Sequence, residues 1–322
     1  MNLGITKTIE IGGKTISIET GKLAKQADGA VVLRMGDTMI LATVVANKGA
    51  KEGVDFLPLT VDYREKFAAD GRIPGSFFRR EARPSEREIL VMRIVDRALR
   101  PLFPDDFHAE VQLMMQLIAY DGVNSPDALV GFAASSCIAV SDIPFNGPMS
   151  EVRVGRVDGE FVINPTLEEM KVSDLDCIIA GTIDNIVMVE GELNEASESE
   201  MVDVIKVAHE AIKKQCQFQL DLASEIPSAL VKREYSHEEH NEEVRERVAA
   251  FSYEKCREVA RQGLASKEKR SELFGAIKDE FLATLTEEET AEIGKFVSVY
   301  FKESMKKAVR DTMLNDNIRL DG

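Results

Sequence analysis

Two phenylalanines and two arginines stand together at positions 77 to 80, and further arginines follow them. The whole cluster consists of Phe77, Phe78, Arg79, Arg80, Arg83, Arg93, Arg97 and Arg100. Guanidinium groups keep their charge and bind phosphate through two parallel hydrogen bonds, while an aromatic ring can stack on an unpaired base of any identity. The cluster therefore predicts a site that binds single-stranded RNA without preference for its base sequence.

This cluster lies in an otherwise acidic chain. The 322 residues include 40 Lys and Arg against 56 Asp and Glu, a formal net charge of −16. The segment from Arg64 to Arg100 contains ten basic and six acidic residues, so its net charge is about +4. A binding site for a polyanion must therefore be confined to one part of the protein surface. The alternative for the segment is a solvated helix face with Glu–Arg pairs, but the aromatic pair favours the RNA site.

A helix is expected to carry the later arginines. Ser85 and Glu88 have the spacing of a capping box, in which each side chain satisfies a free amide of the first turn. Pro101 cannot continue a helix, so the helix is predicted over 86–100. Its apolar stripe consists of Val91, Val95 and Ala98.

Three arginines share another face of this helix. Arg93, Arg97 and Arg100 are four and three residues apart. Three cations in one row repel one another, so the row needs either a bound anion or neighbouring carboxylates. Asp96 and Glu88 are candidates for internal neutralisation, and the two alternatives stay open at this point.

The periodicity divides the chain into two parts. Short alternating runs broken by glycine over 8–46 predict antiparallel hairpins, and residues 1–227 as a whole read as a mixed α+β domain. Residues 237–315 show helical periodicity and predict an all-helical domain, followed by a polar tail at 316–322. Further strands are expected at 56–63, 111–119, 153–157, 160–164, 176–180 and 186–190, and helices at 127–141 and 198–222.

The remaining reactive residue types show no site. The four cysteines, Cys137, Cys177, Cys216 and Cys256, have neither zinc spacing nor the density of a disulfide framework, and we expect buried thiols. Ser135 and Ser136 have no histidine near in sequence, so close packing is preferred to a nucleophile. Neither a signal peptide nor an apolar span is visible, and we expect a cytoplasmic protein that does not bind membranes.

Longer motifs support a resemblance to a known family. They are GSFFRREARPSEREILVMRIVDRALRPLF, YDGVNSPDALVGFAASS, DIPFNGPMSEVRVG, the AGT of residues 180–182 and MVEGELNEASESEM. Together they closely resemble the first core of the bacterial polynucleotide phosphorylase family. The match covers essentially the whole chain, because the helical part resembles that family's linker domain and the RLDG of residues 319–322 resembles the beginning of its second core.

The resemblance implies a ribonuclease PH-like fold and a homotrimeric ring around an RNA channel. The family degrades RNA processively from the 3′ end, with inorganic phosphate releasing nucleoside diphosphates and with Mg²⁺ bound in the second core. It also implies that Phe77, Phe78, Arg79 and Arg80 form the loop that grips the strand, with Arg83 adding charge. Arg93, Arg97 and Arg100 carry over as phosphate contacts, and other RNA-degrading proteins are implied as partners.

The segment that resembles the family's active centre departs from its pattern. The helix opening is Ser125-Pro126-Asp127, where a ring replaces an amide donor and a carboxylate stands where an anion would bind. Asp176 is kept, but Ile178 stands in place of the family's lysine and Met170 in place of its other aspartate. We therefore expect this core to be vestigial, with no catalytic residue and no metal ligand, and inactive by itself.

Two other interpretations remain open. The chain could be a non-catalytic RNA-binding subunit of a ring of the exosome type. A third hypothesis is a hydrolase in which Asp174 and Asp176 hold a metal ion.

Overall fold

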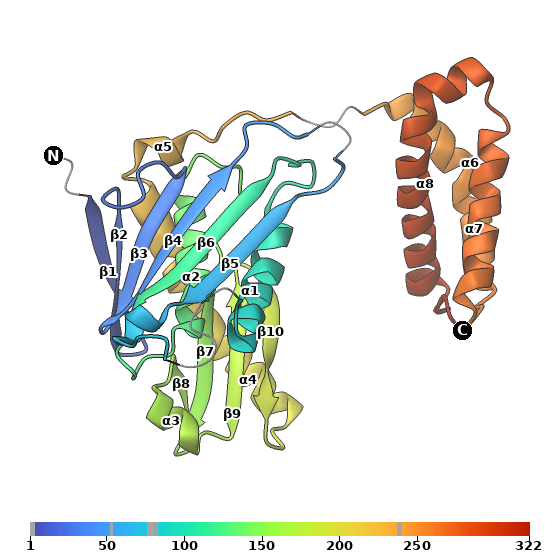
Figure 1. Ribbon diagram of the computed structural model, residues 1–322. Coiled ribbons are helices and arrows are strands. Elements are labelled where there is room, and N and C mark those ends of the chain that lie inside the picture. The colour runs from blue at the N-terminus through green and yellow to red at the C-terminus, as the bar shows by residue number, and fades with distance from the viewer. Residues whose placement is uncertain (1–3, 52–53, 76–80, 82, 237–239) are drawn as a thin grey trace. The chain divides into compact units, whose positions relative to one another are not determined.

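The structure consists of two units. The computed structural model describes residues 4–51, 54–75, 81, 83–236 and 240–322. One unit reaches to residue 237 and the other begins at residue 238. Figure 1 shows strands with packed helices in the first unit and helices in the second.

In the described part of the first unit, four hairpin strands begin a six-stranded sheet. Its strands are β1 (Ile5–Ile11), β2 (Lys14–Thr20), β3 (Gly29–Met35), β4 (Thr38–Ala46), β5 (Leu59–Glu65) and β6 (Val111–Ala119). Their order is β1-β2-β3-β4-β6-β5, with only the β5–β6 pair parallel among these described strands. Buried residues alternate along β4 and β6 because successive side chains point to opposite faces. The predicted hairpins over 8–46 are confirmed.

A second, four-stranded antiparallel sheet follows in the described chain. Its strands are β7 (Ser150–Val157), β8 (Glu160–Ile163), β9 (Leu175–Gly181) and β10 (Ile186–Leu193). They lie in the order β10-β9-β7-β8. The strands lie where the alternating runs predicted them, with ends shifted by a few residues.

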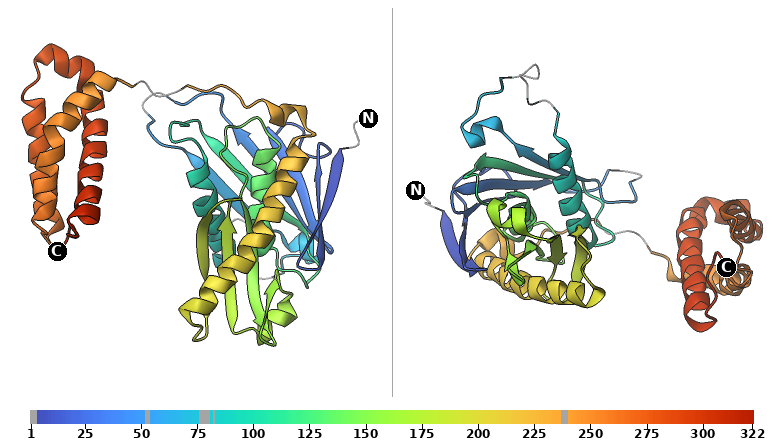
Figure 2. Two further views of the ribbon diagram at one scale, coloured as in Figure 1. Left: turned by 180° about the vertical axis from the view of Figure 1, so that it is seen from behind. Right: turned by 90° about the horizontal axis from the view of Figure 1, so that it is seen from below.

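The helices of the first unit lie against and between these sheets. They are α1 (Glu86–Leu99), α2 (Asp127–Ala139), α3 (Leu167–Val172), α4 (Glu198–Ala223) and α5 (Pro227–Leu230), with short 3₁₀ helices at Phe67–Asp70 and Arg100–Leu102. Helix α1 packs on β5, and α4 packs on β7 and β9. In the view from behind, α4 runs across the face of the second sheet (Figure 2).

Helix α2 is the central element of the first unit. It contacts β3 and β4 of one sheet and β7 of the other, and each residue from Ala128 to Ala139 is buried. An apolar helix without a polar face is stable only in such a position. Ser135 accepts a hydrogen bond from the amide of Met149 at 3.0 Å, and Ser136 donates to the carbonyl of Phe132 at 2.7 Å. The packing role expected for both serines is confirmed.

Helix α1 begins and ends as its sequence predicts. Ser85 and Glu88 form the reciprocal capping box, and the regular helix stops at Leu99, just before Pro101. Val91, Val95 and Ala98 are buried. The predicted helix at 127–141 is α2, whose cap residue is Pro126, and no side chain caps it.

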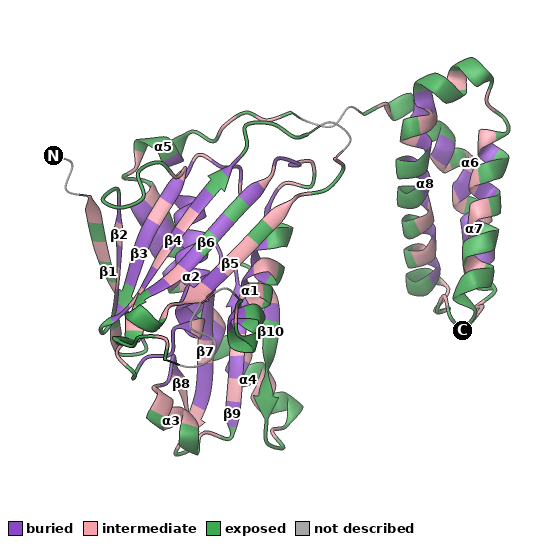
Figure 3. Ribbon diagram, viewed as in Figure 1, coloured by how far each residue is buried: buried purple, intermediate pink, exposed green. Residues whose placement is uncertain are grey.

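The second unit is helical throughout its described residues. Its helices are α6 (Glu242–Arg261), α7 (Lys267–Leu282) and α8 (Glu287–Asn315). Helix α6 packs along α8 and against α7, whereas α7 and α8 touch only briefly. The core contains Val248, Cys256, Phe281, Val297 and Tyr300. Figure 3 shows exposed residues in green along the outer side of α8.

The cysteines are all reduced and buried. Burial raises the pKa of Cys216 to about 12 and that of Cys256 to about 11. The prediction of buried thiols is confirmed. None of the described helices combines the length and the apolar character that crossing a membrane requires.

Candidate functional site

The first four residues of the predicted RNA site, Phe77, Phe78, Arg79 and Arg80, lie outside the described residues, and their role stays a prediction. Arg83 is described and is exposed. It lines a hollow of about 430 Å³ beside the first turn of α1, together with Arg64, Arg72 and Arg87. These three arginines pair with Asp62, Asp70 and Glu65, respectively. Arg83 makes no ion pair or hydrogen bond with any described residue.

The three arginines of the row on α1 have different surroundings. Arg100 binds Asp96 through two hydrogen bonds of 2.6 and 3.2 Å and also donates to the carbonyl of Leu57 at 3.0 Å. Arg97 pairs with Glu190 of β10. Arg93 has no such partner in the described part of the chain. Internal carboxylates therefore neutralise two members of the row and leave Arg93 available.

Glu88, the other candidate for neutralising the row, has a different role. Its carboxylate accepts hydrogen bonds from the amide of Glu65 at 2.7 Å and from that of Ser85 at 2.5 Å. It therefore holds the beginning of α1 against the end of β5. Among the described residues, Asp96 pairs with one arginine of the row, and Glu190, which the sequence did not indicate, pairs with another.

Arg93 and Arg97 line a hollow of about 500 Å³ between α1 and the second sheet. Arg153, Asp176 and Ile178 line the same hollow. Arg93 and Arg100 also line an adjoining hollow of about 530 Å³. The row on α1 therefore faces the segment that departs from the family's active centre.

At that segment, Arg153 of β7 binds two carboxylates at once. Its Nη1 lies 3.0 Å from Oδ2 of Asp127 at the beginning of α2, and its Nε lies 2.7 Å from Oδ1 of Asp176 on β9. The side chains of Arg153 and Asp127 are only 16% and 14% exposed. Ser125 Oγ accepts a hydrogen bond from Arg153 at 3.3 Å. The position at which an anion would meet the N-terminus of α2 is thus filled by a carboxylate that is already paired.

The second acidic residue of this segment has its own arginine. Asp174 accepts two hydrogen bonds of 2.7 Å from Arg156, which also binds Glu200. The hydrogen bond from Arg156 holds the pKa of Asp174 below its ordinary value. Among the described residues, no three His, Cys, Asp or Glu side chains stand close enough to hold a metal ion. Asp174 and Asp176 are each paired with an arginine instead.

The role of Arg153 was not predicted from the sequence. A lone arginine in a strand gives no local signal, because its partners lie 26 and 23 residues away along the chain. The next buried ionisable group on β7, Glu151, was also missed. Burial raises the pKa of Glu151 to about 8, and its Oε1 accepts a hydrogen bond from the amide of Gly131 at 2.6 Å.

Family models match the first unit over most of its length. The 3′ exoribonuclease family, domain 1, matches residues 12–144, and domain 2 of the same family matches residues 147–211. The chain belongs to the 3′ exoribonuclease family. Residues 243–322 of this family member match a third model, that of the polyribonucleotide nucleotidyltransferase RNA binding domain.

Curated relatives of this 3′ exoribonuclease family member share more than half of its residues. A polyribonucleotide nucleotidyltransferase of Bacteroides fragilis is 55% identical over 319 residues, which are 99% of this chain and 45% of the relative. One of Phocaeicola vulgatus is 54% identical with the same coverage. The chain thus spans about 45% of the length of these relatives. The resemblance that the motifs indicated is confirmed.

Solved structures of more distant proteins share the fold. A chain of the Archaeoglobus fulgidus exosome with RNA bound to its active site superposes with a TM-score of 0.53 at 17% identity, covering 63% of this chain and 87% of that one. Rice Rrp46 gives 0.53 at 16% identity, covering 65% and 94%. The predicted α+β class with a ribonuclease PH-like core is confirmed for this family member.

Proposed function

We propose that this chain is the RNA-gripping and catalytically silent part of a polyribonucleotide nucleotidyltransferase. The whole protein would be a cytoplasmic homotrimer that degrades RNA processively from its 3′ end, with inorganic phosphate as co-substrate. We assign the phosphorolytic step to a second core outside this chain, together with Mg²⁺. Residues 1–227 serve as the first core, residues 237–315 as the linker domain, and residues 316–322 as the beginning of the second core.

The observation that carries the silent role is the pairing of Arg153 with Asp127 and Asp176. A phosphate group approaching the N-terminus of α2 would meet the carboxylate of Asp127, and a divalent cation at Asp176 would have to displace Arg153. Phosphoryl transfer needs both an anion pocket and concentrated positive charge at the reacting centre. Here the anion position is occupied by Asp127, and the charge of Arg153 is neutralised by Asp127 and Asp176, so the chain's contribution is to bind and position the strand.

RNA binding itself depends on arginines that form no ion pair with a described carboxylate of the chain. Arg83 and Arg93 are the described members of the predicted site without an ion pair, and they point to phosphate contacts. We propose that Phe77 and Phe78 stack on bases while Arg79 and Arg80 hold phosphates, which gives affinity without sequence preference. Arg97 and Arg100 would then act mainly by keeping α1 in place.

An activity assay tests the silent role. Chain 1–322 incubated with poly(A), inorganic phosphate and Mg²⁺ is expected to release no nucleoside diphosphate, while it still binds labelled oligo(A) in a salt-dependent way. Release of nucleoside diphosphate by the pure chain would overturn the silent role. Release of nucleoside monophosphate without added phosphate, abolished in Asp174→Ala/Asp176→Ala, would favour the hydrolase alternative instead.

A binding assay tests the grip. Arg79→Ala/Arg80→Ala and Arg83→Ala/Arg93→Ala are each expected to weaken oligo(A) binding and to lower the slope of log affinity against log salt by roughly 0.7 per lost phosphate contact. Arg100→Ala is the matched control, because Asp96 already neutralises Arg100. It should lower the melting temperature more than the affinity. Equal affinities in all three variants would contradict the proposed grip.

The non-catalytic ring subunit remains the second candidate. The pairing of Arg153 with Asp127 and Asp176 is compatible with such a subunit and with the silent part of a nucleotidyltransferase. The natural reading frame distinguishes the two. A second core encoded after residue 322 supports the nucleotidyltransferase, and a stop codon there supports the ring subunit.

A further inference from the structure

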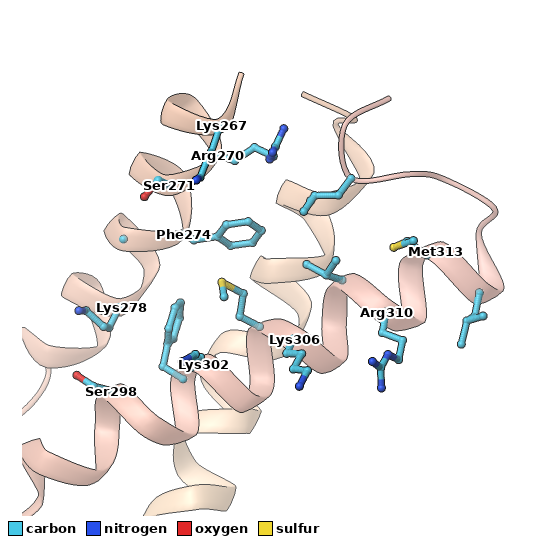
Figure 4. A pocket seen from close by; sticks show the side chains of 16 residues that line it. Lys267, Arg270, Ser271, Phe274, Lys278, Ser298, Lys302, Lys306, Arg310 and Met313 are labelled. Atoms are coloured by element: carbon cyan, nitrogen blue, oxygen red, sulfur yellow. The ribbon is translucent and has the colours of Figure 1, made fainter. Parts of the chain in front are cut away.

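A groove of about 920 Å³ lies between α7 and α8 of the helical unit. Its floor is apolar, with Phe274, Phe301, Met305, Val309 and Met313 among the residues that line it. Figure 4 shows Phe274 pointing from α7 into the space between the two helices. The groove stays open because α7 and α8 pack on α6 but touch each other only briefly. Met313 is 46% exposed there.

Cations follow both edges of this groove. We call them the basic rim, which consists of Lys267, Lys278, Lys302, Lys306 and Arg310. The last three follow one another at intervals of four along α8 and therefore share one face of it (Figure 4). Across the described residues, no carboxylate forms an ion pair with any member of the basic rim.

The opposite side of the helical unit is different. The cations of α6 each bind a carboxylate from the same unit: Arg245 with Glu303, Arg247 with Glu289, Lys255 with Glu280, and Arg257 and Arg261 with Asp316. Glu280 of α7, Glu289 and Glu303 of α8, and Asp316 just after α8 thus pair with α6 and not with the basic rim. In a chain of net charge −16, five unpaired cations around an apolar floor form a local surface of opposite sign.

We propose that this groove binds an acidic amphipathic helix of a partner protein. Apolar side chains of such a helix, spaced three and four residues apart, would lie on the floor while its acidic side chains face the basic rim. The groove runs from Lys267 to Lys278 along α7 and from Ser298 to Leu314 along α8. At about 1.5 Å per residue these stretches are roughly 16 and 24 Å long, so they match a helix of about 11 to 16 residues.

The composition of the floor favours a protein helix over RNA. Phe274 and Phe301 are only 8% and 6% exposed, so neither offers a free ring face on which a base could stack. The accessible part of the floor includes Met305, Met313 and Leu314. Flexible methionine side chains adapt to apolar partners and are frequent at surfaces that bind helices.

A designed peptide tests the proposal on the whole chain. The probe is a fluorescein-labelled peptide of about 16 residues, with leucines at helical spacing and glutamate or alanine elsewhere. Fluorescence anisotropy is expected to show binding that Lys302→Glu/Lys306→Glu weakens by at least about tenfold. Met313→Glu, which alters the exposed floor, should weaken it as well.

Matched controls separate the groove from general charge attraction. Lys269→Glu/Lys307→Glu makes the same change in charge, one on each helix that forms the groove, at exposed residues that do not line it. This variant should keep full affinity, and a scrambled peptide of the same composition should not bind. Circular dichroism and thermal melting check that each variant is folded. Equal weakening by both double variants, or no binding at all, would overturn the proposal.

Two other occupants are distinguished in the same experiment. If oligo(A) displaces the peptide and loses affinity in Lys302→Glu/Lys306→Glu, the groove is an RNA surface and the proposal is wrong. If the chain self-associates by sedimentation and that variant abolishes it, a second copy occupies the groove, which also overturns the proposal. Unchanged oligo(A) binding and an unchanged mass in that variant support the acidic helix, independently of the activity proposed for the whole protein.

Discussion

The centre around Arg153 and the basic rim of the helical unit use the same kind of side chain in opposite ways. Arg153 is 16% exposed and lies between Asp127 and Asp176, and the nearby Arg87 also contacts Asp127 at 3.7 Å. The five cations of the basic rim surround an open groove and have no described counter-charge. We call Arg153 with Asp127 and Asp176 the closed cluster, because its charges pair with one another inside the protein. The basic rim is open, because its cations border a groove and have no ion-pair partner among the described residues.

The difference shows that the density of cations in a sequence does not reveal whether they can bind anything. A half-buried guanidinium between two carboxylates has its hydrogen bonds satisfied inside the protein, and a ligand gains little from it. An exposed, unpaired cation near an apolar surface contributes to recognition, because complementary charge steers and selects partners. Three changes test this contrast.

Removing the arginine from the closed cluster should impair folding. Arg153→Ala leaves two carboxylates without their partner in a poorly solvated place, and we expect a loss of about 3 kcal/mol in the free energy of unfolding. Urea denaturation measures it, and hydrogen exchange of β7 and α2 shows whether the effect lies in the first unit.

The matched control is Arg72→Ala, which removes an arginine that is 73% exposed and pairs with Asp70. Its cost should stay within about 0.5 kcal/mol, as for other surface ion pairs. The variant Arg153→Met/Asp127→Asn/Asp176→Asn removes all three charges and should recover most of the lost stability. A cost at Arg153 no larger than that at Arg72 would show that the cluster is not closed.

A second test uses the pH dependence of Glu151, which lies close to the closed cluster. Burial raises the pKa of its carboxyl from 4.5 to about 8, so the folded protein keeps a proton that the unfolded chain releases above pH 4.5. The stability contributed by this proton is therefore present at low pH and is lost as the pH rises from about 4.5 to about 8. The slope is at most about 1.4 kcal/mol per pH unit.

Glu151→Gln removes this proton exchange while keeping an oxygen that can accept the hydrogen bond from Gly131. The difference in unfolding free energy between the variant and the wild type should grow in favour of the variant as the pH rises through this window. Urea denaturation at a series of pH values measures it. A difference that does not change with pH would mean that Glu151 is ionised in the folded protein.

The third test compares two helical glycines. A Cβ at Gly131 of α2 would lie 2.3 Å from Cδ of the buried Glu151, whereas a Cβ at Gly275 of α7 meets no heavy atom within 4 Å. Gly131→Ala should therefore cost about 1–3 kcal/mol through overpacking. Gly275→Ala should stabilise the helical unit by about 0.5–1 kcal/mol, because alanine loses less backbone entropy in a helix. Thermal melting measures both, and a destabilising Gly275→Ala would argue against an open groove.

Much of the fold follows from local patterns. The Ser85–Glu88 capping box and Pro101 set the ends of α1. Alternating apolar and polar residues, interrupted by glycines, predicted the hairpins. Continuous helical periodicity predicted the helices of the second unit. These signals work because capping, strand alternation and helical repeat depend on residues a few positions apart. The Asp96–Arg100 pair belongs to the same class, since its members are four residues apart on one helix.

The sequence alone determined most of the elements, the family resemblance and the departures at Ile178 and Met170 from the family's pattern. Only the tertiary structure decided which cations are available. Glu190 reaches Arg97 across 93 residues of chain, and Arg153 meets Asp127 and Asp176 because the strand order and the packing of α2 bring them together. An ion pair depends on distance in space, and for residues far apart in the chain that distance is set by the packing of the whole core.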